Sequence, residues 1–268
     1  MNRFFTEKYC VVWAAVAALL IIFARRPSAF LNPQFWAEDG KIWYADAYNH
    51  GLLFSLITPE NGYFQTFSRL VAILSQAFPL KFGPAIFLTV AVIIQIVTAL
   101  FIISPRMSQI VPGRGWRLVL GFLFLAIPHS WEIHTNVTNS QWHLALLACL
   151  IIIAEPSVSK VGRIFDISVC FLAAVSGPFC VLLIPVAIIQ LLIRKDSMYA
   201  VFSGVFLVAG AIHAWAYLGV GRAVPPQLDA GVVSFFQIVA RHLFVSPVIG
   251  GRGFKFWTAT LVLSLIHI

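Results

Sequence analysis

The stretch PAIFLTVAVIIQIVTALFII, residues 84–103, contains twenty residues and no charged side chain. A helix of about 20 apolar residues is long enough to cross the hydrocarbon core of a bilayer. The rest of the chain has the same character, because 60% of its 268 residues are hydrophobic, only 10% are charged and the mean hydropathy is +0.91. Soluble domains carry about 25% charged residues. We therefore expect an all-α, polytopic membrane protein and not a water-soluble fold.

Other apolar runs resemble this one and bring the expected number of spans to seven: 9–24, 84–103, 117–130, 141–154, 165–176, 179–193 and 199–218. Several are shorter than about 17 residues and need flanking residues to cross a bilayer. Gly177-Pro178 is a strong turn signal, so residues 165–193 are predicted to form a helical hairpin; a single kinked helix is the alternative. Residues 231–248 could add an interfacial helix or an eighth span.

Basic residues in the connections indicate the orientation. The connection 104–116 carries two arginines and no acidic residue, whereas 131–140 has no Lys or Arg. Positively charged short loops stay in the cytoplasm, so we expect the N-terminus and 104–116 inside, with 27–83 and 131–140 outside. The net charge of +8 is attributed to this orientation and not to nucleic-acid binding. The expected location is a bacterial inner (plasma) membrane. Arg25 and Arg26, at the outer end of the first span, oppose this orientation.

Residues 27–83 would form an unusually long outer loop, and long ordered loops often carry function. Within it, the segment 64–80 is amphipathic. Its central Arg69 would be costly in a lipid-facing span, so this segment is predicted to lie as a helix in the outer interface.

No internal repeat is evident, so residues 1–262 are predicted to form a single transmembrane domain. The final residues, LSLIHI (263–268), look like the translated end of a transposon used in sequencing libraries. We expect them to be a non-native tail on a truncated chain. A genuine short apolar terminus is the alternative.

Adjacent carboxylates in FWAEDG, residues 35–40, are the first candidates for chemistry. A carboxylate within about 3 Å of an acceptor hydroxyl can act as a general base, and partial burial raises its pKa towards neutrality. We expect Asp39 to be the base, because its side chain is short and the following Gly40 lets the chain turn sharply. Glu38 would orient it or bind a cation. An ordinary solvated pair of acids is the alternative.

A second set of polar residues follows the third span and is expected to bind substrate: Glu132, His134, Asn136, Asn139 and Trp142. Such polar density at a helix entrance is costly unless it meets a cavity, water or a ligand; simple loop solvation is the alternative. Two potential ligands, Glu132 and His134, are too few to predict a metal site.

Four further residues complete the expected substrate-binding set: Tyr63, Arg69, Arg222 and Arg241. The arginines are expected on the outer side, where each guanidinium could bind a lipid phosphate through two hydrogen bonds. Binding to ordinary anionic headgroups is the alternative for each of them.

These features together resemble the GT-C superfamily of integral-membrane glycosyltransferases. Its members share a first span, a long outer loop with an acidic pair and interfacial helices, and a second outer loop with another acid. Glu38 and Asp39 match the first motif, 64–80 matches an interfacial helix, and Glu132 matches the second acid by position. The resemblance covers most of residues 1–220, and its motifs are short.

The resemblance implies transfer of a hexosyl or pentosyl group from a polyprenyl-phosphate donor to a lipid or glycan acceptor on the outer face. In such enzymes an acid of the first outer loop is the base, outer arginines hold the donor phosphate, and some members need a divalent cation. Two rival functions remain. A transporter or lipid flippase would place ionisable residues at mid-membrane depth, and a non-catalytic envelope assembly protein would tolerate loss of both acids.

Labelling with a membrane-impermeant maleimide tests the orientation. In a chain whose native cysteines are replaced by serine, a cysteine at His50 should react in intact cells, because 27–83 is expected outside. A cysteine at Ile110 should react only after permeabilisation. Labelling at position 110 but not at position 50 would contradict the orientation and return 64–80 to a membrane span.

Overall fold

The structure is a computed structural model that describes residues 3–127, 132–220 and 231. Helices and turns account for these residues, and within them extended backbone pairs only at an isolated bridge between Glu60 and Tyr63. The all-α prediction is confirmed. Contacts divide the chain into a first unit, 1–125 with 133–223, and a second unit, 126–132 with 224–268. Most of the second unit, including the predicted segments 231–248 and 263–268, lies outside the described residues.

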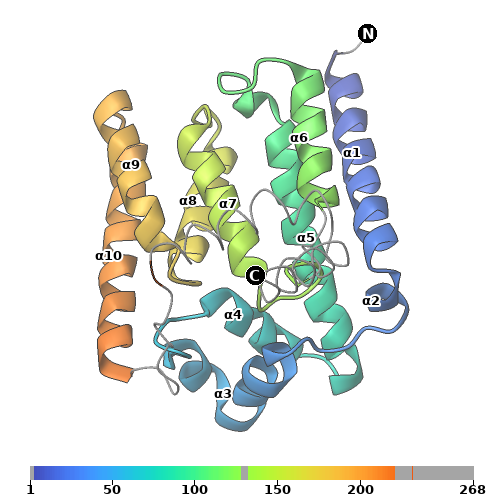
Figure 1. Ribbon diagram of the computed structural model, residues 1–268, viewed down its shortest axis with the longest axis vertical. Helices are drawn as coiled ribbons and strands as arrows, with labels where there is room; N and C mark the ends of the chain where they lie inside the picture. The colour runs from blue at the N-terminus through green and yellow to red at the C-terminus, as the bar shows by residue number, and fades with distance from the viewer. Residues whose placement is uncertain (1–2, 128–131, 221–230, 232–268) are drawn as a thin grey trace, which may run out of the picture. The chain divides into compact units, whose positions relative to one another are not determined.

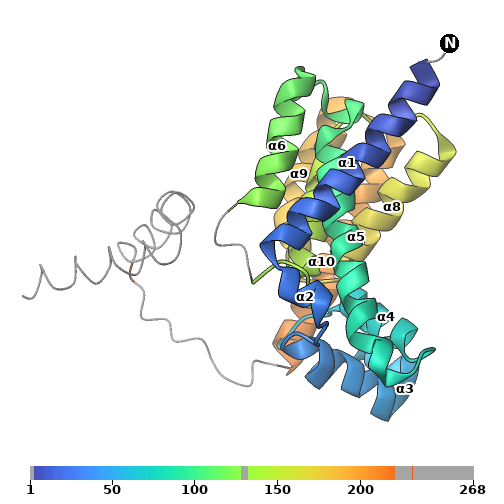
Figure 2. The same ribbon diagram turned by 90° about the vertical axis from the view of Figure 1, so that its right-hand side faces the viewer.

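The longer helices of the first unit run alongside one another (Figures 1 and 2): α1 (Arg3–Arg25), α5 (Gly83–Ile103), α6 (Arg114–Ala126), α7 (Ser140–Ile153), α8 (Lys160–Ala174), α9 (Cys180–Arg194) and α10 (Ser197–Val220). Each predicted span overlaps one of them. The predicted turn is also present, because the helical conformation is interrupted between α8 and α9. Gly177 in this turn has a φ of +146°, a backbone conformation that residues with a side chain rarely adopt. The predicted turn is therefore confirmed in place of a single kinked helix, although α8 and α9 pack mainly against α7 and α10 and not against each other.

Helix length limits the number of crossings that the structure supports. Among the described residues, two helices are long and apolar enough to span a bilayer, Leu80–Ile103 and Ser197–Gly219. By contrast, α7 has 14 residues, and at 1.5 Å per residue it measures about 21 Å, against a hydrocarbon core of about 30 Å. The predicted count of seven or eight spans is not confirmed.

Short helices fill the chain between α1 and α5: α2 (Pro27–Leu31), the π-helix η1 (Asp39–Tyr44), α3 (Ala45–Ile57), α4 (Thr66–Ser75) and the 3-10 turn η2 (Leu80–Phe82). They gather at the end of the long helices where α1 ends and α5 begins (Figure 1). At the opposite end, another 3-10 turn, η3 (Pro105–Met107), follows α5.

The expected interfacial helix differs from the prediction. It is shorter than 64–80, and part of its polar face is turned inward, because Ser68 and Arg69 are buried whereas Leu70 and Leu74 are exposed. The reason is a non-local partner: Arg69 forms an ion pair with Asp46 of α3. A polar residue of an amphipathic pattern can face inward when a charge of opposite sign, here the half-buried Asp46, lies within reach.

Apolar side chains cover the outward faces of the long helices. Trp13, Leu20, Leu192, Trp215 and Leu218 are between 61% and 83% exposed. Polar groups, in contrast, are found among the buried residues of the same helices. A large exposed apolar surface marks contact with a membrane or another protein.

An ion pair at the end opposite the short helices connects η3 to α8. The Arg106 guanidinium donates two hydrogen bonds to the Asp166 carboxylate, at 2.7 and 2.8 Å, and a third to the carbonyl oxygen of Glu155 at 2.8 Å. Asp166 is 1% exposed. Its charge is therefore compensated by a bidentate partner, the strongest geometry for such a pair.

Arg106→Gln is expected to lower the free energy of unfolding by about 3 kcal/mol, because it leaves Asp166 buried without its charge partner. The double variant Arg106→Gln, Asp166→Asn should recover part of this loss. Arg163→Gln, which removes an exposed charge from α8, is the control and should change stability by less than about 0.5 kcal/mol. Unfolding in detergent measures all three. A single variant as stable as the control would show that the pair is not stabilising.

Candidate functional site

Asp39 connects the two predicted outer loops. Its carboxylate is 1% exposed and lies in the first turn of η1. Oδ1 accepts hydrogen bonds from the backbone N–H and the hydroxyl of Thr138, both at 2.8 Å, and Oδ2 accepts one from the backbone N–H of Val137 at 3.3 Å. Both carboxylate oxygens are occupied. This geometry suits an anchor better than a general base, which must reach the hydroxyl of a substrate.

The protonation of Asp39 reflects two opposing effects. Burial raises the pKa of Asp39 to about 6, because the charged form loses its hydration, and the hydrogen bonds from Thr138 and Val137 act in the opposite direction. Since this value lies above the ordinary pKa of aspartate, the folded state binds a proton more tightly than the unfolded chain.

Trp43 extends the anchor towards α4. Its Nε1–H donates to the Thr138 hydroxyl at 2.9 Å, and that hydroxyl in turn donates to Asp39. The Arg69 guanidinium lies over the Trp43 ring, 4.9 Å from its centroid. A chain of contacts therefore runs from the second outer loop through η1 to α4.

Arg69 is not placed to bind a phosphate at the surface. It is fully buried, and its Nη1 donates to Asp46 at 2.9 Å and to Ser55 at 3.4 Å. Its Nε and Nη2 have no hydrogen-bond partner among the described residues, and the face of the Trp43 ring stands against the guanidinium. The Arg69 side chain therefore cannot make the predicted contact with a lipid phosphate, because the predicted first outer loop covers it.

Glu38, next to Asp39, differs from Asp39 and Arg69 in both exposure and hydrogen bonding. It is partly exposed and forms no hydrogen bond or ion pair with any residue that the structure describes. The preceding Ala37 has a φ of +38°, a left-handed conformation that costs a non-glycine residue about 1–3 kcal/mol and often occurs at functional sites. The following η1 is a π-helix, which is also frequent at such sites.

Gly40 has a different role from the one predicted. Its φ is not positive, so the backbone does not need glycine for a sharp turn. A Cβ at this position would instead lie 2.9 Å from the Cβ of Phe35. The position requires glycine because Phe35 packs directly on the backbone of η1.

His134 is held as a neutral imidazole. Its Nε2 contacts the Arg25 guanidinium, which can only donate, so Nε2 accepts and the proton lies on Nδ1, 2.8 Å from Oε1 of Gln95. Burial lowers the pKa of His134 to about 3, and the nearby charges of Arg25 and Arg26 contribute in the same direction. Both ring nitrogens are engaged by protein groups. The predicted role of His134 in substrate binding would require these contacts to break.

Arg25 and Arg26 bind protein groups at the end of α1. Arg25 also donates to the carbonyl oxygen of Leu125, and Arg26 donates to the carbonyl oxygen of His134 at 2.7 Å. The Arg26 guanidinium lies 4.5 Å from the centroid of the Trp36 ring. In the sequence these arginines are only an exception to the orientation rule, because their carbonyl partners lie 100 and 108 residues further along the chain.

The remaining predicted residues fall into two groups. Asn136 is buried and shapes the second outer loop, since its Oδ1 accepts from the backbone N–H of Asn139 at 2.9 Å. Trp142 is 49% exposed and packs against Phe179, and Tyr63 is half-buried. These two residues present aromatic surface at the same end as Glu38, on which a flat apolar face of a ligand can pack.

Glu132 is exposed and belongs to the second unit, and Arg222 and Arg241 lie outside the described residues. Across residues 3–127 and 132–220, no group of three His, Cys, Asp or Glu side chains could hold a metal ion. One cavity of about 150 Å³, lined by Phe64 and His213 among others, lies near the start of α4; neither Glu38 nor Asp39 lines it.

The pKa of Asp39 predicts a pH dependence that can be isolated by comparison with Asp39→Asn. Because the folded-state pKa is raised, wild type should gain stability relative to the variant as the pH falls through 6. The gain should be about 1 kcal/mol between pH 7.5 and 5 and should end near pH 4, at the unfolded-state pKa. Denaturant unfolding at several pH values measures this difference. A difference that does not change with pH would mean that Asp39 is not buried as described.

Searches against protein-family models, curated proteins and solved structures found no match to this chain. The features that carry most weight are the anchored carboxylate of Asp39, the unpartnered carboxylate of Glu38 and the strained backbone at Ala37.

Proposed function

We propose that the protein is a membrane glycosyltransferase and that Glu38 is its general base. The observation that carries the proposal is the pairing of an unpartnered, partly exposed Glu38 with a buried and fully hydrogen-bonded Asp39. The Glu38 carboxylate is free to contact a substrate, while the Asp39 carboxylate holds the first loop against the second. This reverses the roles expected from the sequence.

Membrane placement is supported by the apolar outward faces of the long helices and by the distribution of charge. The connections 104–113, 154–159 and 195–196 lie at one end of the first unit. Basic residues at this end are Arg106 and Lys195 in the connections and Arg114, Arg117, Lys160, Arg163 and Arg194 at the adjoining helix ends. That end would face the cytoplasm. Residues 27–83 and 132–139 would then lie outside, at an inner membrane of bacterial type.

The substrate class rests on the resemblance to the GT-C superfamily. In the proposed reaction, Glu38 takes the proton of an acceptor hydroxyl while that oxygen bonds to the anomeric carbon of the sugar. The bond between this carbon and the phosphate oxygen breaks, and the polyprenyl phosphate leaves with the electron pair.

A transporter or flippase is the second candidate, and the helices give it less support. From α5 to α10, Asp166 is the acidic residue within a long helix, and it is already paired with Arg106. A coupled transporter would require a free ionisable group at depth.

Glu38→Gln should lower sugar transfer from a polyprenyl-phosphate donor by about 10²–10⁴-fold, the usual contribution of a general base, while the unfolding midpoint stays unchanged. Glu60→Gln is the matched control, because it makes the same change in the same outer loop and should leave transfer near the wild-type rate. Asp39→Asn should lower both activity and stability, since it alters the anchor. The assay is transfer in liposomes containing the purified full chain.

Near-normal transfer in Glu38→Gln would remove the base assignment. If Asp39→Asn lost transfer while keeping wild-type stability, Asp39 would be the base, as the sequence suggested. Full activity in both variants would show that the acidic pair is structural and would favour an assembly protein.

A further inference from the structure

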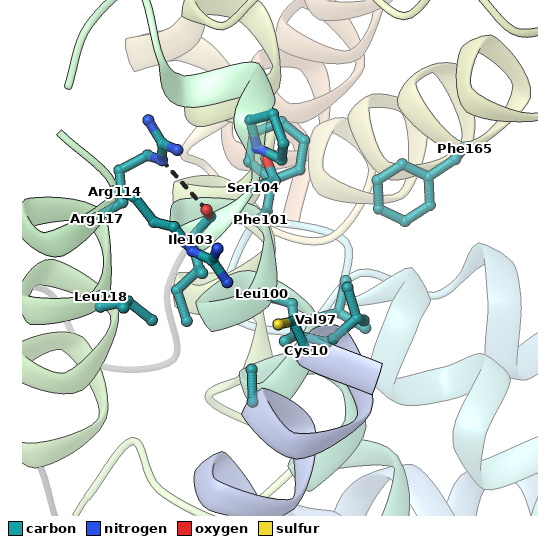
Figure 3. A pocket seen from close by; sticks show the side chains of 13 residues that line it. Cys10, Val97, Leu100, Phe101, Ile103, Ser104, Arg114, Arg117, Leu118 and Phe165 are labelled. Carbon is teal, nitrogen blue, oxygen red and sulfur yellow. Dashed lines mark hydrogen bonds between the residues drawn. The ribbon is translucent and has the colours of Figure 1, made fainter. Parts of the chain in front are cut away.

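A larger cavity lies at the other end of the first unit. It has a volume of about 580 Å³, within the roughly 300–1,000 Å³ of small-molecule and lipid sites. Its wall is almost entirely apolar and is built by α1, α5, α6 and α8, with Ala14, Leu100, Leu118 and Phe165 among the lining residues (Figure 3). None of the residues discussed at the candidate active site lines it.

Two arginines stand at one side of this cavity. Arg114 and Arg117 both come from the first turn of α6, and Figure 3 shows them together, across the cavity from Phe165. Arg117 is buried and is committed to the protein, because its guanidinium donates to the carbonyl oxygens of Ile103 and Val111 at 3.2 and 2.9 Å. Arg114 is exposed, and within the described part of the chain it has no hydrogen-bond or ion-pair partner.

The charge of Arg114 has no compensating partner in the described part of the chain. The N-terminus of a helix carries a partial positive charge and favours negative groups. Yet the first turn of α6 contains two arginines and no acidic residue. An anion bound beside Arg114 would meet both the positive end of the helix and the guanidinium.

Two more features agree with a headgroup at this position. Trp116, in the same turn, is 69% exposed, and tryptophan is enriched where a membrane meets water. The Ser104 hydroxyl, which belongs to a residue lining the cavity, is buried and lacks a partner among the described residues. It could donate to an ester or phosphate oxygen.

We infer that this cavity binds an anionic phospholipid, with an acyl chain in the apolar space between α1, α5 and α6 and the phosphate beside Arg114. The shape of the site joins a wide apolar space to a single basic edge, and this combination fits a charged headgroup on a hydrocarbon tail. Basic pockets between helices on the cytoplasmic side bind anionic headgroups in this manner. The inference rests on the proposed membrane placement but not on the proposed transfer chemistry.

Native mass spectrometry of the full chain released from nanodiscs tests the inference. With phosphatidylglycerol and phosphatidylcholine of identical acyl chains, wild type should retain phosphatidylglycerol about fivefold better, since a basic residue near a membrane surface contributes about 1 kcal/mol towards an anionic lipid. Arg114→Gln should lose this preference. Lys160→Gln is the matched control, because it removes an exposed charge at the same end but away from the cavity.

Two further measurements separate the parts of the site. Ala14→Trp should fill the apolar space and lower retention of both lipids, with the unfolding midpoint reporting whether the fold is kept. Soluble glycerol phosphate should fail to displace the bound lipid; displacement would overturn the inference in favour of a free-anion site. Equal retention of the two lipids by wild type, or equal losses in Arg114→Gln and Lys160→Gln, would also overturn it.

The result is distinguishable from a failure of the proposed function. A chain that transfers sugar but shows no lipid preference contradicts only the lipid site. A chain with the lipid preference but no transfer contradicts only the glycosyltransferase. A chain recovered in the soluble fraction of cells would contradict the membrane placement on which both depend.

Discussion

The buried carboxylate of Asp39 is the constraint around which the end of the first unit that carries the short helices is organised. Removing a carboxylate from water is expensive unless fixed donors replace its hydration. Those donors are the backbone and hydroxyl of Thr138 and the backbone of Val137, so the second loop must take one conformation for the first loop to fold. Trp43 then transmits the same constraint to Arg69 and α4. The backbone position of Glu38 is fixed because hydrogen bonds hold the adjacent Asp39 in place.

The outward faces of the first unit are apolar, and its largely apolar interior also holds polar groups. Several of these buried polar groups pair with one another, whereas atoms of Arg69 and Ser104 have no partner among the described residues. In a bilayer no water is present to complete missing hydrogen bonds, so each internal polar group needs a protein partner. The contact of His134 with Gln95 and Arg25 is such an arrangement, and the pair of Arg106 with Asp166 is another. Arg25 and Arg26 at the end of α1 therefore have a structural role, since their guanidinium groups bind protein groups.

The two ends of the first unit differ in the chemistry that they offer. At the end with the short helices, backbone strain at Ala37 and a free carboxylate at Glu38 provide a reactive group on a rigid support. At the other end, Arg114 faces a wide apolar cavity without an anionic partner. A protein that receives lipid-linked sugar at one face and binds structural lipid at the other would use both features.

The sequence by itself determined the helices, because apolar runs such as 84–103 and the turn at Gly177 are local patterns that the chain carries wherever it folds. It also marked Glu38 and Asp39 as unusual. Only the tertiary structure decided which of them is free, since the donors to Asp39 lie about a hundred residues away at Thr138. For the same reason the inward direction of Arg69 could not be foreseen: periodicity identifies a polar face, but burial of that face depends on a distant partner of opposite charge.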